Sequence, residues 1–223
     1  MQEIQIGRMI LGPVGTNSYY VYRDGQKDTK DSSQERTPVV LIDPPDAGER
    51  IYDALRERGF FIERILLTHA HFDHIGGIAG ILSRSDDKIP VAAPEAEKSL
   101  CEDPELNCSL SMGGHGVTVR PDIWLHDGET VEAAGVTLQV IATPGHTVGS
   151  CCFYIGEAGV LISGDTLFAG SVGRADLPTG SMSTLVRSIK EKLFDLPDET
   201  LVLPGHGEET TIGDEKRYNP FIQ

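Results

Sequence analysis

Short apolar runs rich in β-branched residues alternate along the chain with stretches whose apolar positions recur every three or four residues. The runs have the length and bounding turn residues of buried strands. We predict strands over residues 19–22, 39–42, 65–67, 138–142, 160–163 and 201–203. Strands and helices that alternate in this order indicate a mixed α/β fold.

Three stretches have the apolar spacing of amphipathic helices. In the first, Ile51, Ala54 and Leu55 share a face, Asp46 is placed to cap the helix, and Gly59 is placed to end it. The apolar positions of the other two are Ile75, Ile78 and Leu82, and Leu185, Ile189 and Leu193. Each helix lies between two predicted strands.

Two segments lack any periodicity. Residues 23–37 are almost wholly polar, with four basic and four acidic side chains, and we interpret them as a solvated hairpin extension outside the catalytic site. Residues 100–119 are rich in turn-forming residues such as Pro104 and Asn107, and we expect a surface connection that borders the site.

The composition narrows the class of protein. With 223 residues and 39% hydrophobic content, we expect residues 1–223 to form a single domain. The formal charge is −15 and no basic cluster is present, which argues against nucleic acid as a partner. The first ten residues lack the pattern of a secretion signal, and no apolar run is long enough to span a membrane, so we expect a cytoplasmic protein.

The four cysteines have no common zinc-binding spacing. Cys151 and Cys152 are adjacent on a predicted strand, where neighbouring side chains point to opposite faces and cannot easily share a ligand. We expect all four, including Cys101 and Cys108, to be reduced, with Cys151 or Cys152 in the core.

Five of the seven histidines follow directly after predicted buried strands, where loops of a shared sheet edge converge. The densest segment is T-H-A-H-F-D-H, residues 68–74, in which an extended chain would place His69, His71 and Asp73 on one side and His74 at a helix start. The remaining two histidines, His115 and His126, belong to no motif, and we interpret them as structural or surface groups.

Three further segments also place a candidate ligand after an apolar run. His146 stands in T-P-G-H-T, Asp165 in S-G-D-T and His206 in L-P-G-H-G, each after an apolar run and beside Gly or Pro. Burying so many imidazoles and carboxylates without a cation would carry a severe desolvation cost. The set therefore predicts a metal site.

The motif H-x-H-x-D-H, followed by His, Asp and His in this order, resembles the metallo-β-lactamase superfamily over essentially the whole chain. The resemblance implies a four-layer αβ/βα sandwich and two divalent metal ions. One ion would be held by His69, His71 and His146, the second by Asp73, His74 and His206, with Asp165 bridging both. It also implies that Asp43 orients a ligand histidine. We expect zinc, although these ligands also accept iron or manganese.

The segment after Asp165, residues 164–180, resembles the glyoxalase II-like branch, and the short chain is similar to the bacterial hydrolases that lack the helical C-terminal domain. Arg174 matches a basic residue that contacts glutathione in glyoxalase II, whereas Asp176 replaces an aromatic residue. The implied reaction is hydrolysis of an anionic thioester, such as a hydroxyacylglutathione, by a metal-bridging hydroxide. Asp73 would orient this nucleophile and receive its proton.

Other functions remain open for this superfamily. A mononuclear iron persulfide dioxygenase would use His69, His146 and Asp165, but P-G-H-G at 204–207 is typical of the short hydrolases. Hydrolysis of a lactone or another ester is a further alternative. β-Lactam hydrolysis is disfavoured because the best-known class has Cys at the position of Asp165. A non-catalytic binding role is disfavoured because no ligand is missing.

Overall fold

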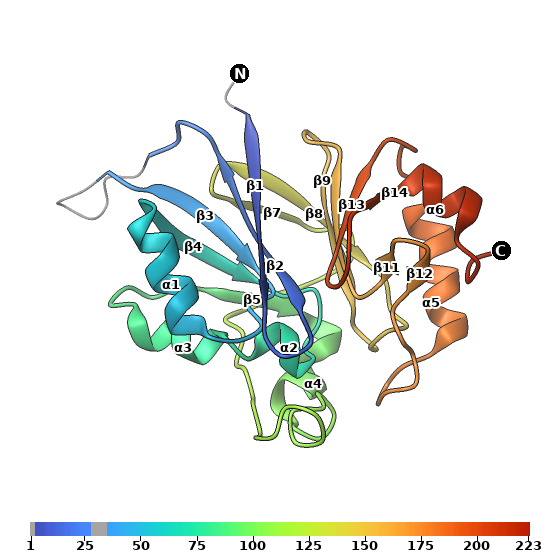
Figure 1. Cartoon of the computed structure of the whole chain (residues 1–223), viewed down its shortest axis with the longest axis horizontal. Helices are drawn as coiled ribbons and strands as arrows, with labels where there is room; N and C mark the ends of the chain where they lie inside the picture. Colours follow the sequence, from blue (N-terminus) through green and yellow to red (C-terminus); the bar gives the residue numbers. More distant parts are fainter. Residues whose placement is uncertain (1–2, 28–34) are drawn as a thin grey trace.

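The computed structural model describes residues 3–27 and 35–223, in which two six-stranded sheets pack face to face. Figure 1 shows α1 and α3 on the outer side of the first sheet and α5 and α6 on the outer side of the second. Helix, sheet, sheet and helix thus form four layers. This arrangement confirms the α/β sandwich predicted from the sequence.

The first sheet has the strand order β1-β2-β3-β4-β5-β6, with parallel pairing from β3 to β6. Its strands are β1 (Ile4–Leu11), β2 (Thr16–Arg23), β3 (Thr37–Ile42), β4 (Phe60–Leu66), β5 (Val91–Pro94) and β6 (Ile123–Leu125). The helical segments of this half are α1 (Gly48–Glu57), α2 (Phe72–Ile75), α3 (Ile78–Arg84), the 3₁₀ turn η1 (Glu95–Glu97) and α4 (Lys98–Glu102).

The second sheet has the order β14-β13-β10-β9-β8-β7, and a separate hairpin joins β11 to β12. The strands are β7 (Thr130–Ala133), β8 (Val136–Ala142), β9 (Cys151–Ile155), β10 (Val160–Gly164), β11 (Leu167–Phe168), β12 (Ser171–Val172), β13 (Leu201–Pro204) and β14 (Thr210–Thr211). The helical segments are α5 (Met182–Ser188), the π-helical turn η2 (Ile189–Leu193) and α6 (Ile212–Tyr218).

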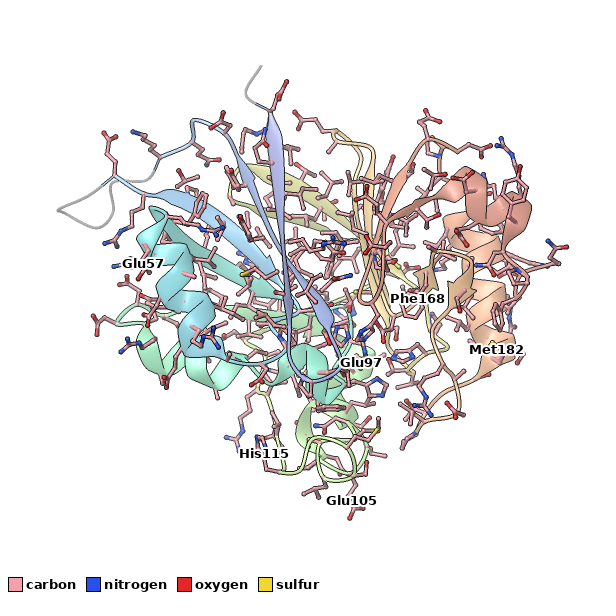
Figure 2. The ribbon with its side chains drawn as sticks, viewed as in Figure 1. Glu57, Glu97, Glu105, His115, Phe168 and Met182 are labelled. Carbon is pink, nitrogen blue, oxygen red and sulfur yellow. The ribbon has the colours of Figure 1, made fainter. Side chains whose placement is uncertain are left out.

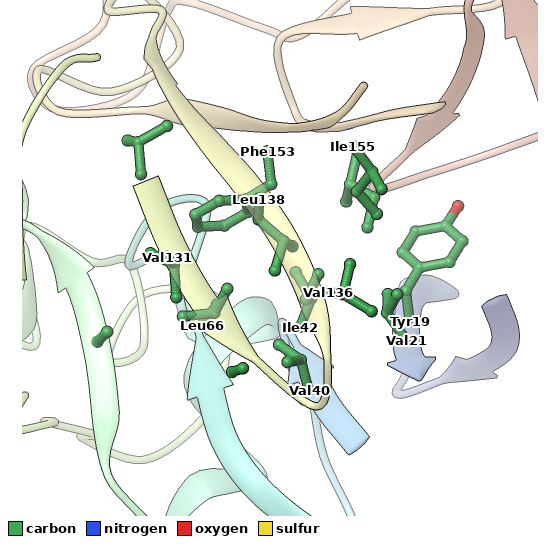
Figure 3. Close-up of a cluster of buried hydrophobic side chains, with 14 of the residues drawn as sticks. Tyr19, Val21, Val40, Ile42, Leu66, Val131, Val136, Leu138, Phe153 and Ile155 are labelled. Atoms are coloured by element: carbon green, nitrogen blue, oxygen red, sulfur yellow. The ribbon is translucent and has the colours of Figure 1, made fainter. Parts of the chain in front are cut away.

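The main core fills the space between the two sheets. Figure 3 shows Val21, Ile42 and Leu66 of the first sheet against Leu138 and Phe153 of the second, all of them buried. Two further clusters lie beneath the outer helices. Because strand residues alternate between faces, each sheet contributes to the central core and to one outer cluster.

The cysteines are distributed over these layers as free, buried thiols. Cys151 belongs to the core between the sheets, whereas its neighbour Cys152 points to the cluster under α5. Cys101 lies in the cluster beneath the helices of the first sheet. The opposite orientation of Cys151 and Cys152 is confirmed.

Two helix predictions were wrong in detail. Ala47, not Asp46, occupies the N-cap position of the first helix, and no side chain caps it. The Asp46 carboxylate instead accepts a hydrogen bond from the Ala47 amide at 2.6 Å. The second is divided into α2 and α3, and the break rotates the helix face, so Ile81 is buried while the predicted Leu82 is 41% exposed. Gly59 ends α1 as predicted, with a φ of +81°.

Of the polar segment 23–37, residues 28–34 lie outside the described part of the chain, so the predicted hairpin extension is described only at its ends, where Lys27 and Glu35 form an exposed ion pair. Segment 100–119 begins in α4 and then forms turns, with Cys108 and Met112 on the cavity described below. It therefore borders the site, as expected. None of the described helices has the length and apolar character to cross a bilayer.

Buried polar side chains tie the sheets together at one edge. Asn17 of β2 donates from Nδ2 to the carbonyl oxygens of Pro204 and Gly207, at 2.9 and 3.0 Å. The Tyr19 hydroxyl donates to the same Pro204 oxygen at 2.8 Å. The loop after β13 is thereby fixed to the first sheet.

Asn17→Ala should lower the free energy of unfolding by about 2–4 kcal/mol, because it removes two hydrogen bonds and leaves the Gly207 carbonyl without this donor. Tyr19→Phe should cost about 1 kcal/mol, since the Pro204 oxygen keeps its bond from Asn17. Urea-induced unfolding measures both. Equal stabilities of Asn17→Ala and the parent protein would contradict this account of the sheet edge.

Candidate metal centre

The four predicted motifs meet at one edge of the sandwich. Each follows the end of a strand, β4 in the first sheet and β8, β10 and β13 in the second. The side chains brought together are His69, His71, Asp73, His74, His146, Asp165 and His206. Figure 2 labels Phe168, which lines the cavity over them, at the hairpin of β11 and β12 beside the second sheet.

His69, His71 and His146 form the first group, with their candidate ligand atoms within 4.8 Å of one another. Nδ1 of His71 lies 2.9 Å from Nε2 of His146. The rings of His71 and His146 both stand edge-on to that of His69, with centroids 4.9 and 4.7 Å away. This group joins a loop of the first sheet to a loop of the second.

Asp73, His74 and His206 form a second such group. Oδ2 of Asp73 lies 3.2 Å from Nε2 of His206 and 3.7 Å from Nε2 of His74. Asp165 stands between the groups, with one oxygen 3.4 Å from His74 Nε2 and the other 3.5 Å from Nε2 of His146. Its position suits a carboxylate shared by two cations.

One expectation about this segment was wrong. The extended stretch ends at His71, and Asp73 lies in the first turn of α2 together with His74. Asp73 reaches the second group because the helix turns it toward the loop of His206, not because it continues the alternation of His69 and His71. The spacing in the sequence thus pointed to Asp73 correctly, but the backbone conformation predicted for it was wrong.

The donor set fits a metal. Nε2 of His69, His71 and His74 and Oδ1 of Asp165 are buried, and none of them has a hydrogen-bond partner among the described residues. Buried polar atoms are nearly always paired, and imidazole nitrogens with carboxylate oxygens are ligands for divalent transition metals. Cations at this edge would satisfy all four atoms.

The first group carries neutral imidazoles. Burial lowers the pKa of His69 well below its usual value and brings that of His71 to about 3. Burial also lowers the pKa of His146. These three side chains therefore present lone pairs at neutral pH, the state in which a histidine binds metal.

The second group holds protons when no cation is bound. Burial opposes charge on His74, but Asp73 and Asp165 outweigh it and raise its pKa well above the usual value. For His206, burial is likewise overcome by contacts with Asp165 and Asp73, and its pKa rises to about 9. Burial would raise the pKa of Asp73, yet His74 and His206 bring it down to about 2.

Several buried groups orient the candidate ligands. Asp43 accepts hydrogen bonds from Thr68 and lies 3.0 Å from Nδ1 of His74, as expected from the sequence, although without hydrogen-bond alignment. The Thr16 hydroxyl donates to Asp73 Oδ2 at 2.9 Å. His146 Nδ1 lies 2.6 Å from the backbone oxygen of Arg174, which fixes the ring. No motif marks Thr16 in the sequence.

The P-G-H-G segment requires its first glycine for space. A Cβ atom on Gly205 would lie 2.2 Å from Asp165 Oδ1 and 2.9 Å from His74 Cε1. No side chain fits at that separation. The loop of His206 can approach the other ligands only with glycine at this position.

A cavity of about 370 Å³ opens over the centre. Its apolar walls are formed by Val14, Phe72, Met112, Phe168, Val172 and Leu177. Arg174 is the only Lys or Arg among the described residues that line it, and its guanidinium pairs with Asp176 at 2.7 and 2.9 Å. The structure thus places Arg174 at the site but in an ion pair that the sequence did not indicate.

The two histidines outside the motifs take no part in these groups. His126 is exposed and lies 3.4 Å from Glu95, while His115 is exposed in segment 100–119. Neither contributes a candidate ligand atom.

Comparison with known proteins gives a consistent picture. Residues 11–206 match the Metallo-beta-lactamase superfamily. Over 216 residues the chain is 39% identical to the Probable metallo-hydrolase YqgX of Bacillus subtilis, with 96% of each chain covered. It is 36% identical over 186 residues to the Hydroxyacylglutathione hydrolase GloC of Haemophilus influenzae, covering 82% of this chain and 87% of that protein.

Solved structures agree with this. BLEG-1, described as a B3 metallo-beta-lactamase, superimposes with a TM-score of 0.87 at 37% identity, covering 98% of this chain and 99% of its own. TTHA1623 in a di-iron-bound form gives 0.81 at 37% identity, with 96% and 99% covered. ETHE1 from Myxococcus xanthus gives 0.71 at 28% identity, with 97% and 83% covered.

Zinc addition to metal-free protein at pH 7.5 should release two protons from His74 and His206, because both must lose theirs to become ligands, and up to one more from a water molecule that the two cations ionise. The first group should release none, since its histidines are already neutral. Release should fall above pH 9, where His206 is neutral before zinc arrives. A pH indicator in weakly buffered solution measures this, and no release at pH 7.5 would contradict the assignment.

Proposed function

The chain belongs to the metallo-β-lactamase superfamily and is a metal-dependent hydrolase, and we propose that its substrate is a thioester such as a hydroxyacylglutathione. One observation carries the proposal. Two adjoining groups of ligand side chains share Asp165 and open onto a cavity with apolar walls and one arginine. The similarity to the Haemophilus influenzae hydrolase supports the thioester as the substrate class.

We assign His69, His71 and His146 to one cation, and Asp73, His74 and His206 to the other, with Asp165 touching both. Zinc is the first expectation, and the similarity to a di-iron structure supports iron as the alternative. Two divalent cations held by these residues would polarise the substrate carbonyl and lower the pKa of a water molecule to near neutrality.

Asp73 is the residue we assign to proton transfer. Its Oδ2 is held by the Thr16 hydroxyl at 2.9 Å and lies 3.2 Å from His206, whereas no described residue forms a hydrogen bond to Oδ1. The carboxylate lines the cavity and is ionised, so Oδ1 is free to orient the attacking water and accept its proton.

A thioester suits what the cavity offers. A simple thiol has a pKa of about 8.5, so a thiolate leaves without help from an acid, whereas an amide nitrogen needs a proton donor. The cavity walls are largely apolar, and Arg174 is the group we assign to a substrate carboxylate. The positive charge of two bound cations would add attraction for an anionic substrate.

Two other reactions are supported by specific similarities. The similarity to the Myxococcus xanthus structure supports persulfide oxidation as a candidate reaction, with one iron held by His69, His146 and Asp165. The similarity to the BLEG-1 structure supports β-lactam hydrolysis as a candidate, although the presence of Asp165 disfavours that reaction. The complete group of Asp73, His74 and His206 supports two cations over one. We retain the thioester first, with other esters and lactones after it.

We also propose a cytoplasmic location and a single domain over residues 1–223. Four free, buried cysteines fit a reducing compartment. Both sheets contribute to one central core and to one site, which is what a single domain requires.

Protein purified without chelators should carry about two metal ions and hydrolyse S-D-lactoylglutathione. Elemental mass spectrometry gives the metal content, and thiol release gives the rate. The same sample is assayed for oxygen uptake with glutathione persulfide and for opening of a chromogenic cephalosporin. About one iron with oxygen uptake, or β-lactam turnover without thioester turnover, would overturn the proposal.

Asp73→Asn should lower kcat by about 10²-fold or more at saturating zinc, because the amide cannot accept the proton. Steady-state kinetics with a folded-state check by circular dichroism measures this. Asp195→Asn, a change of the same kind at an exposed position, is the matched control. A kcat for Asp73→Asn within twofold of the parent would exclude the assigned role.

Arg174→Ala should raise KM for an anionic thioester by about tenfold and leave kcat within a few-fold, because it removes a charge that binds substrate and transition state equally. The exposed Arg187→Ala serves as the control. The two constants are measured with S-D-lactoylglutathione. If KM stays unchanged, Arg174 does not bind the substrate carboxylate.

A further inference from the structure

A carboxylate lies buried behind the first group of histidines. Glu97, at the end of η1, has no exposed surface, and burial raises its pKa. Figure 2 labels it near the middle of the molecule. No Lys, Arg or His among the described residues forms an ion pair with it. A charge without a counter-charge is costly to bury, so the reason for its presence lies in its hydrogen bonds.

Those bonds join two loops. Oε2 of Glu97 accepts from the Ala70 amide at 2.8 Å, and Ala70 stands between the two histidines of the first loop. Oε1 accepts from the Thr147 hydroxyl and from the Gly149 amide, both at 2.7 Å, and Thr147 directly follows His146. One side chain thus holds both segments of the first group.

The loop of His146 approaches η1 closely at Gly149. A Cβ atom there would lie 2.6 Å from the Glu97 amide nitrogen and 2.8 Å from its Oε1. A larger residue would push the loop of His146 away from η1. The glycine of the H-T-V-G segment is therefore explained by the approach of this loop to Glu97.

These hydrogen bonds require both oxygens of the Glu97 side chain to be acceptors. The Ala70 and Gly149 amides can only donate, so an apolar side chain would leave two buried N–H groups unpaired. Glutamine could accept at one end only, and its NH₂ would face an N–H group at the other. The carboxylate is thus the form of this side chain that satisfies both loops.

We propose that Glu97 is a positioning residue that sets the affinity of His69, His71 and His146 for their cation by holding the two histidine-bearing loops at a fixed separation. The inference rests on the proposed metal centre. It is specific to one group, because Glu97 forms no hydrogen bond to the segments of His74, Asp165 or His206. Orienting contacts of this kind typically alter metal affinity about 10–100-fold.

Glu97→Gln should weaken one of the two zinc-binding steps by about tenfold or more and leave the other unchanged. Stepwise zinc affinities are measured on metal-free protein by competition with a chromophoric chelator, without substrate. Thr147→Val, which removes one of the three donors, should weaken the same step by a smaller factor, and it provides the test if Glu97→Gln does not fold.

Glu215→Gln is the matched control. Glu215 is also buried and accepts hydrogen bonds from the Gly170 amide, the Thr210 hydroxyl and the Asn219 amide group, none of which adjoins His69, His71 or His146. The Glu215→Gln substitution should lower the melting temperature of the metal-free protein, while both zinc affinities stay as in the parent. A structural role alone would make Glu97→Gln behave in the same way.

Two outcomes would overturn the inference. Unchanged affinities in the folded Glu97 or Thr147 variant would remove the positioning role, and an equal loss at both steps would show a general weakening of the fold. If the parent protein itself binds only one zinc ion, the proposed two-cation centre fails, and the inference fails with it. Two ions in the parent with unchanged variants would leave the proposed function intact.

Discussion

The structure depends on the gathering of five imidazoles, four of them buried, and two largely buried carboxylates at one edge of an apolar sandwich. Several of their atoms have no hydrogen-bond partner among the described residues, and this arrangement is costly unless cations complete it. Other features follow from that constraint. Gly205 makes room for Asp165 and His74, and Asn17 fixes the loop that carries His206.

The charges of the centre differ between its two halves. Burial dominates around His69 and keeps that group neutral, whereas carboxylates dominate around His74 and hold protons there. A cation therefore meets open lone pairs in one half and must displace protons in the other. Asp165 contacts both halves and couples them. The cavity above adds apolar walls and Arg174, the features to which we assign the choice of substrate.

Much of this could be predicted from the sequence because it is local. A strand that ends before H-x-H-x-D-H places its histidines at a sheet edge, and the superfamily fold confirms that inference. Local patterns did not reveal that α2 begins at Phe72 or that Ile81 replaces Leu82 in the core. Thr16 acts across 57 positions of the chain through one hydrogen bond, and Glu97 acts across 27 to 52 positions through three, none of which follows from the periodicity of the sequence. Such contacts depend on how the two sheets meet.

The most direct test is anomalous diffraction from crystals of protein purified without added metal, recorded on either side of the zinc and iron absorption edges. The account predicts two peaks about 3.5–4 Å apart. One should contact His69, His71 and His146, the other Asp73, His74 and His206, and Asp165 should reach both. A single peak bound only by His69, His146 and Asp165, with His74 and His206 uncoordinated, would contradict it.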